Sequence, residues 1–308
     1  MTTEKTFYFM TGLPRSGSTL LSSILNQNPK FYSGPSSPVV ATMLTLEQAF
    51  SQDELFLGYP KTEVAKNIIA SILPQYYSDI SKPIIFDKNR SWVNRMNYIP
   101  GYFDIVPKII CPVRDITEIL TSFILMCRRN PYTNQTKINF VDEMLIKSNI
   151  PLTDNNRCQF LASSNGILGQ SYNGLKQAIM EGYDHCLHFV EYKDLVNNPQ
   201  ETLNKIYDFL DEEPFEHTFN NLGNPHREND MQIYGFPDMH EVRSNLSSTA
   251  SKPEEILSPE TLSKCENSEF WRTLTSNLDD DFDVHLDLDL EDDDNYNTEK
   301  TSFIGTSV

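Results

Sequence analysis

The sequence is poor in features that mark several classes of protein. Its five cysteines are odd in number and widely spaced, without a CxxC pair, which argues against a disulfide framework or a zinc site. No apolar run approaches the ~20 residues of a membrane-spanning helix. The N-terminal residues also lack the layout of a signal peptide. These absences predict a cytoplasmic protein without a membrane span.

Positive charge is scarce as well, because 25 lysines and arginines stand against 43 acidic residues, for a net charge of −18. Nucleic-acid binding draws on a lysine and arginine surface, and no such cluster occurs, so no nucleic-acid partner is expected. Residues 277–308 hold 11 acids and one lysine. We interpret them as a flexible, low-complexity acidic tail that follows one folded domain over residues 1–276. The alternative is an edge strand formed by the alternating residues 281–290.

Short apolar segments alternate with segments of helical periodicity along the rest of the chain. Strands are expected at residues 6–11, 82–87, 108–113 and 185–190, and helices at 18–26, 38–50, 61–77, 115–128, 154–181 and 200–210. Residues 214–258 are polar and rich in Asn, Pro and Gly, which indicates a long loop. The alternation predicts a single α/β domain in which helices flank a central parallel sheet.

The first expected strand leads into residues 12–19, which read GLPRSGST. This segment has the glycines and the final hydroxyl of the phosphate-binding loop G-x-x-x-x-G-K-[ST], which holds phosphate through backbone N–H groups and a helix N-terminus. Ser18 stands at the position of the lysine that reaches the β- and γ-phosphates of a nucleotide, which argues against ATP or GTP turnover. Arg15 lies inside the loop and is the candidate for the missing cation.

A second motif follows the third expected strand, where Arg114 is placed at the strand end and Ser122 lies eight residues later. Arginine grips phosphate through two parallel hydrogen bonds. Eight residues correspond to about two helical turns, so Ser122 is expected on the helix face that also carries the helix start.

Together these segments resemble the sulfotransferases that use 3′-phosphoadenosine-5′-phosphosulfate (PAPS). Their 5′-phosphosulfate loop reads P-[RK]-[ST]-G-[ST]-[ST], and their 3′-phosphate motif is an arginine followed eight residues later by a serine. The resemblance implies a fold related to the P-loop nucleotide kinases and PAPS as the sulfonate donor, with no metal. It implies these binding residues: Arg15, Ser16, Gly17, Ser18 and Thr19 for the 5′ end, and Arg114 and Ser122 for the 3′-phosphate.

Two later segments are similar to parts of the same family. Residues 189–195 (FVEYKDL) resemble the [RH]-Y-E-D-L segment, which implies that Tyr192 lies near the cofactor. Residues 240–244 (HEVRS) resemble a late loop that closes over the cofactor, with Arg243 in the basic position.

Asp87 and Lys88 end the second expected strand and resemble the acid–lysine pair of the carbohydrate sulfotransferases. By this resemblance Asp87 is the general base, while Lys88 and Arg15 stabilise the departing phosphate. Residues 34–38 (GPSSP), expected to form a loop, resemble the protein-tyrosine branch in framework but lack its glutamate base. If the chain follows that branch, the base is missing, and His240 is a more distant candidate.

The predicted function is therefore in-line transfer of a sulfonate group from PAPS to a hydroxyl or amine of an acceptor. The acceptor is a glycan, a small molecule or a peptide, and the acidic charge disfavours polyanions. Two alternatives remain open: a kinase-like P-loop enzyme and a non-catalytic module that binds PAPS or its product.

Overall fold

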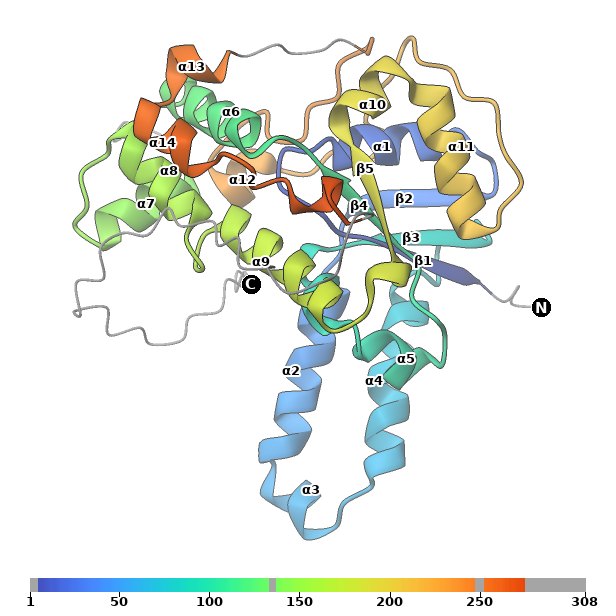
Figure 1. Cartoon of the computed structure of the whole chain (residues 1–308). Coiled ribbons are helices and arrows are strands. Elements are labelled where there is room, and N and C mark those ends of the chain that lie inside the picture. Colours follow the sequence, from blue (N-terminus) through green and yellow to red (C-terminus); the bar gives the residue numbers. More distant parts are fainter. Residues whose placement is uncertain (1–4, 133–136, 247–251, 275–308) are drawn as a thin grey trace.

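The computed structural model describes residues 5–132, 137–246 and 252–274, with a five-stranded parallel sheet at the centre (Figure 1). The strands follow the order β2-β3-β1-β4-β5, and they are β1 (Thr6–Met10), β2 (Phe31–Ser36), β3 (Ile84–Lys88), β4 (Ile109–Val113) and β5 (Leu187–Glu191). The predicted α/β architecture with a flanked parallel sheet is confirmed. The acidic segment 277–308 and the alternative strand at 281–290 lie outside the described residues.

Strand β2 corrects the expectation of a loop over residues 34–38. Its sequence FYSGPS contains Gly34 and Pro35, which normally interrupt strands. The strand lies at the edge of the sheet, where a residue without an N–H is tolerated, and its register with β3 shifts between Ser33 and Ser36.

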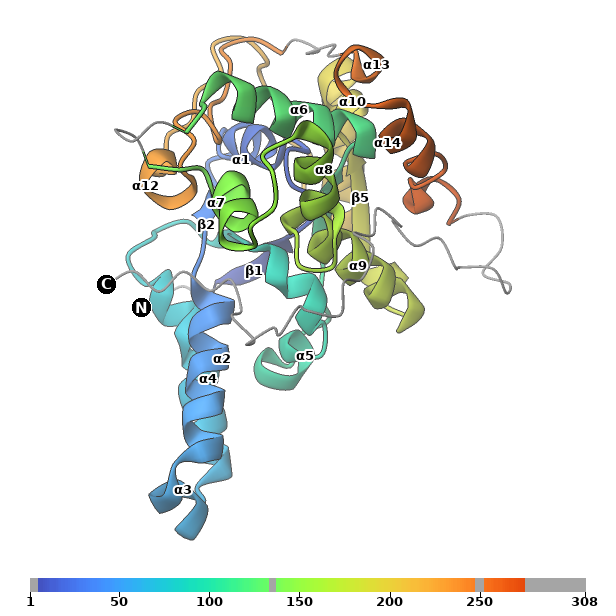
Figure 2. The ribbon, with the colours of Figure 1, turned by 90° about the vertical axis from the view of Figure 1, so that its left-hand side faces the viewer.

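Fourteen α-helices are described, and several of them cover the two faces of the sheet (Figure 2). They are α1 (Ser18–Leu25), α2 (Val39–Gln52), α3 (Glu54–Gly58), α4 (Thr62–Tyr76), α5 (Tyr98–Phe103), α6 (Ile116–Arg129), α7 (Phe140–Lys147), α8 (Asp154–Ala162), α9 (Ile167–Met180), α10 (Tyr192–Asn197), α11 (Pro199–Leu210), α12 (Asp230–Tyr234), α13 (Pro253–Ile256) and α14 (Pro259–Lys264). In the described parts of the predicted loop, residues 214–246 and 252–258, the chain is mostly irregular but includes α12 and α13.

The alternation of side chains along β1 divides the core in two. Phe9 belongs to the larger cluster, which also contains buried residues of α2, α4, α6 and α9. Tyr8 and Met10 point to the opposite face and belong to the smaller cluster with α1 and α11. The carboxyl ends of the strands therefore lie between two packed layers of helices.

Helices α2, α3 and α4 form a hairpin that projects from the body (Figure 1). Met43 and Leu73 are buried on these helices, whereas Leu55 and Tyr59, near the tip, are 86% and 74% exposed. Burial on this hairpin thus decreases from its base toward its tip.

His217 lies buried beside α11, with its Nε2 3.0 Å from the Tyr207 hydroxyl. Burial lowers the pKa of His217 to about 4, whereas the unfolded chain keeps a value near 6.5. The free energy of unfolding that depends on neutral His217 is therefore fully present above pH 6.5 and is lost as the pH falls toward 4. In urea unfolding curves, as the pH falls from 6.5 to 4, the wild type should lose about 2–3 kcal/mol more of its free energy of unfolding than His217→Gln does.

His185→Gln, at a histidine that is 67% exposed, is the matched control for the substitution itself. Equal pH dependence in the wild type and in His217→Gln would contradict this account.

Candidate active site

A cavity of about 320 Å³ opens beyond the carboxyl ends of β1, β4 and β5, where ligands bind in open α/β sheets. Its polar lining is dominated by positive charge, although the whole chain carries a net charge of −18. Five of the ten arginines line it: Arg15, Arg90, Arg114, Arg129 and Arg243. The cavity is therefore suited to a ligand with several negative charges.

Residues 12–19 form a tight loop between β1 and α1. Gly12 and Gly17 adopt φ values of 110° and 87°, in the region that favours glycine, and Arg15 shares it with φ 58°. A Cβ on Gly12 would lie 2.3 Å from the carbonyl oxygen of Pro112, so the loop can pass close to β4 only with glycine at this position. No side chain caps α1 at Gly17, which leaves its first N–H groups available to an anion.

Eight of the nine residues predicted to bind the cofactor line this cavity: Arg15, Gly17, Ser18, Thr19, Arg114, Ser122, Tyr192 and Arg243. Ser16 is the exception. Its hydroxyl is buried and lies 2.8 Å from the carbonyl oxygen of Pro112, within hydrogen-bond distance. The Ser16 side chain thus fixes the loop to β4 and does not face the ligand space.

The two predicted phosphate motifs contact one another directly. Arg15 Nε donates a 3.2 Å hydrogen bond to Ser122 Oγ, and Arg114 Nη1 donates a 3.3 Å bond to the carbonyl oxygen of Arg15. Burial and the nearby charges of Arg114 and Arg129 lower the pKa of Arg15 to about 10. Arg15 stays charged at neutral pH, and an anion in the cavity would relieve this crowding of cations.

Tyr192, at the start of α10, holds the arginine of the second motif in place. The Arg114 guanidinium carbon lies 4.5 Å from the centre of the Tyr192 ring, and Arg114 Nε donates a 2.6 Å hydrogen bond to Glu118. A Cβ on Gly17 would lie 2.7 Å from the same ring, so the loop at 12–19 can pack against this tyrosine only with glycine at position 17. Arg114 is thus oriented from two sides.

Asp87 and Lys88 are consecutive in β3 and therefore point to opposite faces of the sheet. Asp87 is 0% exposed and does not line the cavity. Its carboxylate accepts hydrogen bonds from Ser37 Oγ (2.9 Å), the Tyr77 hydroxyl (2.9 Å) and Trp92 Nε1 (2.6 Å). Burial raises the pKa of Asp87, and these three bonds oppose the rise. Contact between Asp87 and an acceptor stays a prediction, and this placement argues against it.

Lys88 faces the other side of the sheet and is 6% exposed. It lines a second, small cavity of about 10 Å³ together with Thr19 and Glu228. Thr19 also lines the large cavity, so Lys88 lies next to the loop at 12–19. Burial lowers the pKa of Lys88, and the nearby Glu228 carboxylate opposes this effect.

Replacing Asp87 separates a structural role from a catalytic one. Asp87→Asn is expected to lower the free energy of unfolding by about 2–4 kcal/mol, because the amide cannot accept all three hydrogen bonds. Exposed Asp208→Asn is the control for the loss of one charge. An Asp87→Asn protein with unchanged stability and abolished transfer would instead support the predicted general base.

Several residues of the large cavity were not among the predicted site residues. Arg90 follows Lys88 by two residues, and Arg129 follows Ser122 by seven, which is about two turns of α6. These spacings are signals that sequence reasoning can use. Met239 and Asn245 come from an irregular segment whose pattern gives no such signal.

The profile of the sulfotransferase family matches residues 8–217, about two thirds of the chain. The chain belongs to the sulfotransferase family. The matched range includes both motifs predicted to bind phosphate and Tyr192 of this sulfotransferase, while Arg243 lies beyond it. No curated protein matches the chain.

This sulfotransferase also has similar solved structures. The sulfotransferase domain of the Synechococcus PCC 7002 olefin synthase is 18% identical, with a TM-score of 0.45, over 90% of this chain and 97% of that domain. The corresponding domain from the curacin biosynthetic pathway is 17% identical, with a TM-score of 0.44, over 69% and 75%. Retinol dehydratase, solved in a complex with retinol and PAP, is 13% identical, with a TM-score of 0.43, over 90% and 84%. None of the described helices of this sulfotransferase has the length and hydropathy to cross a membrane.

Proposed function

We propose that this sulfotransferase moves the sulfonate group of PAPS to a hydroxyl or amine of an acceptor by in-line transfer. The observation that carries the proposal is the contact between Arg15 of the phosphate loop and Ser122 of the second motif inside one cationic cavity. Two motifs 107 residues apart in the chain meet there. One ligand with a phosphate at each end would engage both.

In this proposal the loop N–H groups and the start of α1 bind the 5′-phosphosulfate. Arg114 and Ser122 bind the 3′-phosphate, and Arg243 covers the nucleotide from the late segment. As the acceptor attacks sulfur, charge grows on the oxygen that bridges sulfur and the leaving phosphate. Arg15 and Lys88 supply positive charge toward that oxygen, which is the main source of rate enhancement in group transfers of this kind.

One observation favours the alternative of a non-catalytic module that binds PAPS or its product. Asp87 is buried away from the cavity, so the residue predicted as the base has no path to an acceptor in this conformation. A kinase-like reaction is less favoured, because Ser18 replaces the lysine that contacts the β- and γ-phosphates.

We propose an uncharged or weakly charged acceptor, because the nucleotide takes up the cationic cavity in this proposal and the net charge of −18 over the whole chain repels polyanions. A cytoplasmic location is part of the proposal. All five cysteines are free and buried, as expected in a reducing compartment.

The proposal is tested by release of the product 3′-phosphoadenosine-5′-phosphate (PAP) from PAPS in the presence of a panel of alcohols, sugars and peptides. Lys88→Met is expected to lower turnover by about 10²–10³-fold while PAP binding persists, because its charge acts mainly in the transition state. Exposed Lys66→Met is the control. Tight PAP binding without turnover on any acceptor would favour the binding module.

A further inference from the structure

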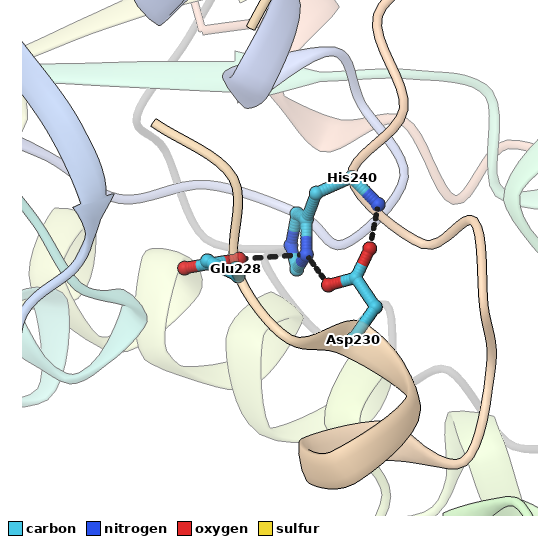
Figure 3. Close-up of side chains that lie close together, drawn as sticks. All are labelled: Glu228, Asp230 and His240. Carbon is cyan, nitrogen blue, oxygen red and sulfur yellow. Dashed lines mark hydrogen bonds and ion pairs between the residues drawn. The ribbon is translucent and has the colours of Figure 1, made fainter. Parts of the chain in front are cut away.

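Three titratable side chains converge on one point beside the large cavity (Figure 3). His240 Nδ1 lies 2.6 Å from Asp230 Oδ1 and 2.7 Å from Glu228 Oε2. All three side chains are at least 87% buried, since their exposed fractions are 13% for His240, 8% for Asp230 and 9% for Glu228. Of these residues, His240 lines the large cavity and Glu228 lines the small one.

The cluster contains one hydrogen fewer than its contacts require. A ring nitrogen carries at most one proton, and the Nδ1 of His240 is placed to donate it to Asp230. The Oε2 of Glu228 approaches the same nitrogen but is buried and receives no hydrogen bond in the described part of the chain. Burying a carboxylate oxygen without a hydrogen-bond donor lowers the stability of the fold, so a cation bound at this oxygen would be stabilising.

We propose that Glu228 Oε2, Asp230 Oδ1 and His240 Nδ1 bind a divalent transition-metal ion, Mn²⁺ or Zn²⁺. The three ligand atoms lie within 4.8 Å of one another, and the pairs at 2.6 and 2.7 Å need to separate by only about 0.5 Å to reach the spacing of ligands around a single ion. Two carboxylates and one imidazole suit these ions better than Ca²⁺ or Mg²⁺, which prefer oxygen alone. This proposal departs from the expectation of a protein without a metal, which was taken from the family resemblance.

The arrangement around the cluster supports this assignment. Each carboxylate is fixed by a backbone N–H through its other oxygen: Glu228 Oε1 accepts from Ser36 N at 2.9 Å, and Asp230 Oδ2 accepts from His240 N at 2.8 Å. Such outer hydrogen bonds orient ligands toward a metal. The ion would join the end of β2 to the segment 228–240.

The neighbouring charges determine when the ion binds best. Lys88 and Arg90 lie close enough to interact with Glu228, and Arg15 interacts with Asp230. These cations weaken the attraction for a metal while the cavity is empty. An anionic nucleotide in the cavity offsets their charge, so the metal is expected to bind about 10-fold more tightly with PAP present. This coupling rests on the proposed function, whereas the metal site itself does not.

The test uses the full chain after treatment with a chelator, titrated with MnCl₂ or ZnCl₂ in the presence and absence of PAP. Calorimetry and loss of the six-line electron paramagnetic resonance signal of free Mn²⁺ report binding directly. One ion per chain is expected. Glu228→Gln and His240→Gln are expected to weaken binding by about 100-fold.

Exposed Glu241→Gln is the control, since it removes a neighbouring carboxylate outside the cluster. Circular dichroism and thermal melting establish that each variant is folded, and Asp230→Asn provides a third variant. The proposal is overturned if the wild type binds neither ion up to millimolar concentration, or if the glutamine variants bind as the wild type does. Failure of PAP to bind, with metal binding intact, would contradict the proposed function alone.

Discussion

Arg114→Ala is expected to weaken binding of PAP by about 30- to 1,000-fold, which corresponds to about 2–4 kcal/mol for a charge-assisted contact to phosphate. Arg114 directly follows β4, stacks on Tyr192 and is held by Glu118, so its guanidinium faces the cavity in a fixed orientation. Isothermal titration calorimetry with PAP measures the effect. The PAP affinity of Arg114→Lys should lie between those of the wild type and Arg114→Ala, because lysine keeps the charge but loses the paired hydrogen bonds.

Arg95→Ala is the matched control for Arg114, since Arg95 is exposed and does not line the cavity. Its PAP affinity should equal that of the wild type. Wild-type affinity in Arg114→Ala would mean that the second motif does not bind phosphate.

Gly12→Ala is the second substitution with a large expected effect. The new Cβ would lie 2.3 Å from the carbonyl oxygen of Pro112, and alanine disfavours a φ of 110°. We expect a loss of about 2–4 kcal/mol in the free energy of unfolding, together with loss of PAP binding, because the loop must move away from β4. Chemical denaturation and calorimetry measure the two effects.

Gly101→Ala is the control for Gly12, because a Cβ on Gly101 would meet no atom within 4 Å and the residue lies in helix α5. This variant is expected to be at least as stable as the wild type. A Gly12→Ala protein of unchanged stability and affinity would show that the loop adopts another conformation.

The gathering of the two motifs around one cavity could be predicted from the sequence because their residues occur at fixed spacings. The loop at 12–19 and the pair Arg114 and Ser122 each lie where a strand ends and a helix begins. Their spacing in the sequence therefore fixes their relative positions. The parallel sheet was predictable because strand-like and helix-like segments alternate along the chain. Of the five described strands, only β2 was not expected, because its Gly34 and Pro35 are residues that normally interrupt strands.

The remainder of the site depends on contacts between distant segments. Glu228, Asp230 and His240 come from a polar segment without periodicity, and only folding brings them together beside the cavity, which His240 alone of the three lines. The prediction that Asp87 is the general base conflicts with the direction of its side chain. In a strand, consecutive side chains point to opposite faces, so Asp87 and Lys88 do not face the same space.

The central claim is that the cavity recognises a nucleotide phosphorylated at both its 3′ and 5′ positions. Thermal unfolding in the presence of PAP, ATP or ADP tests it most directly. At ~100 times its dissociation constant, PAP is expected to stabilise the fold by about 2.7 kcal/mol, and ATP and ADP should do so far less. Equal or greater stabilisation by ATP, or no stabilisation by any of the three, would contradict the claim.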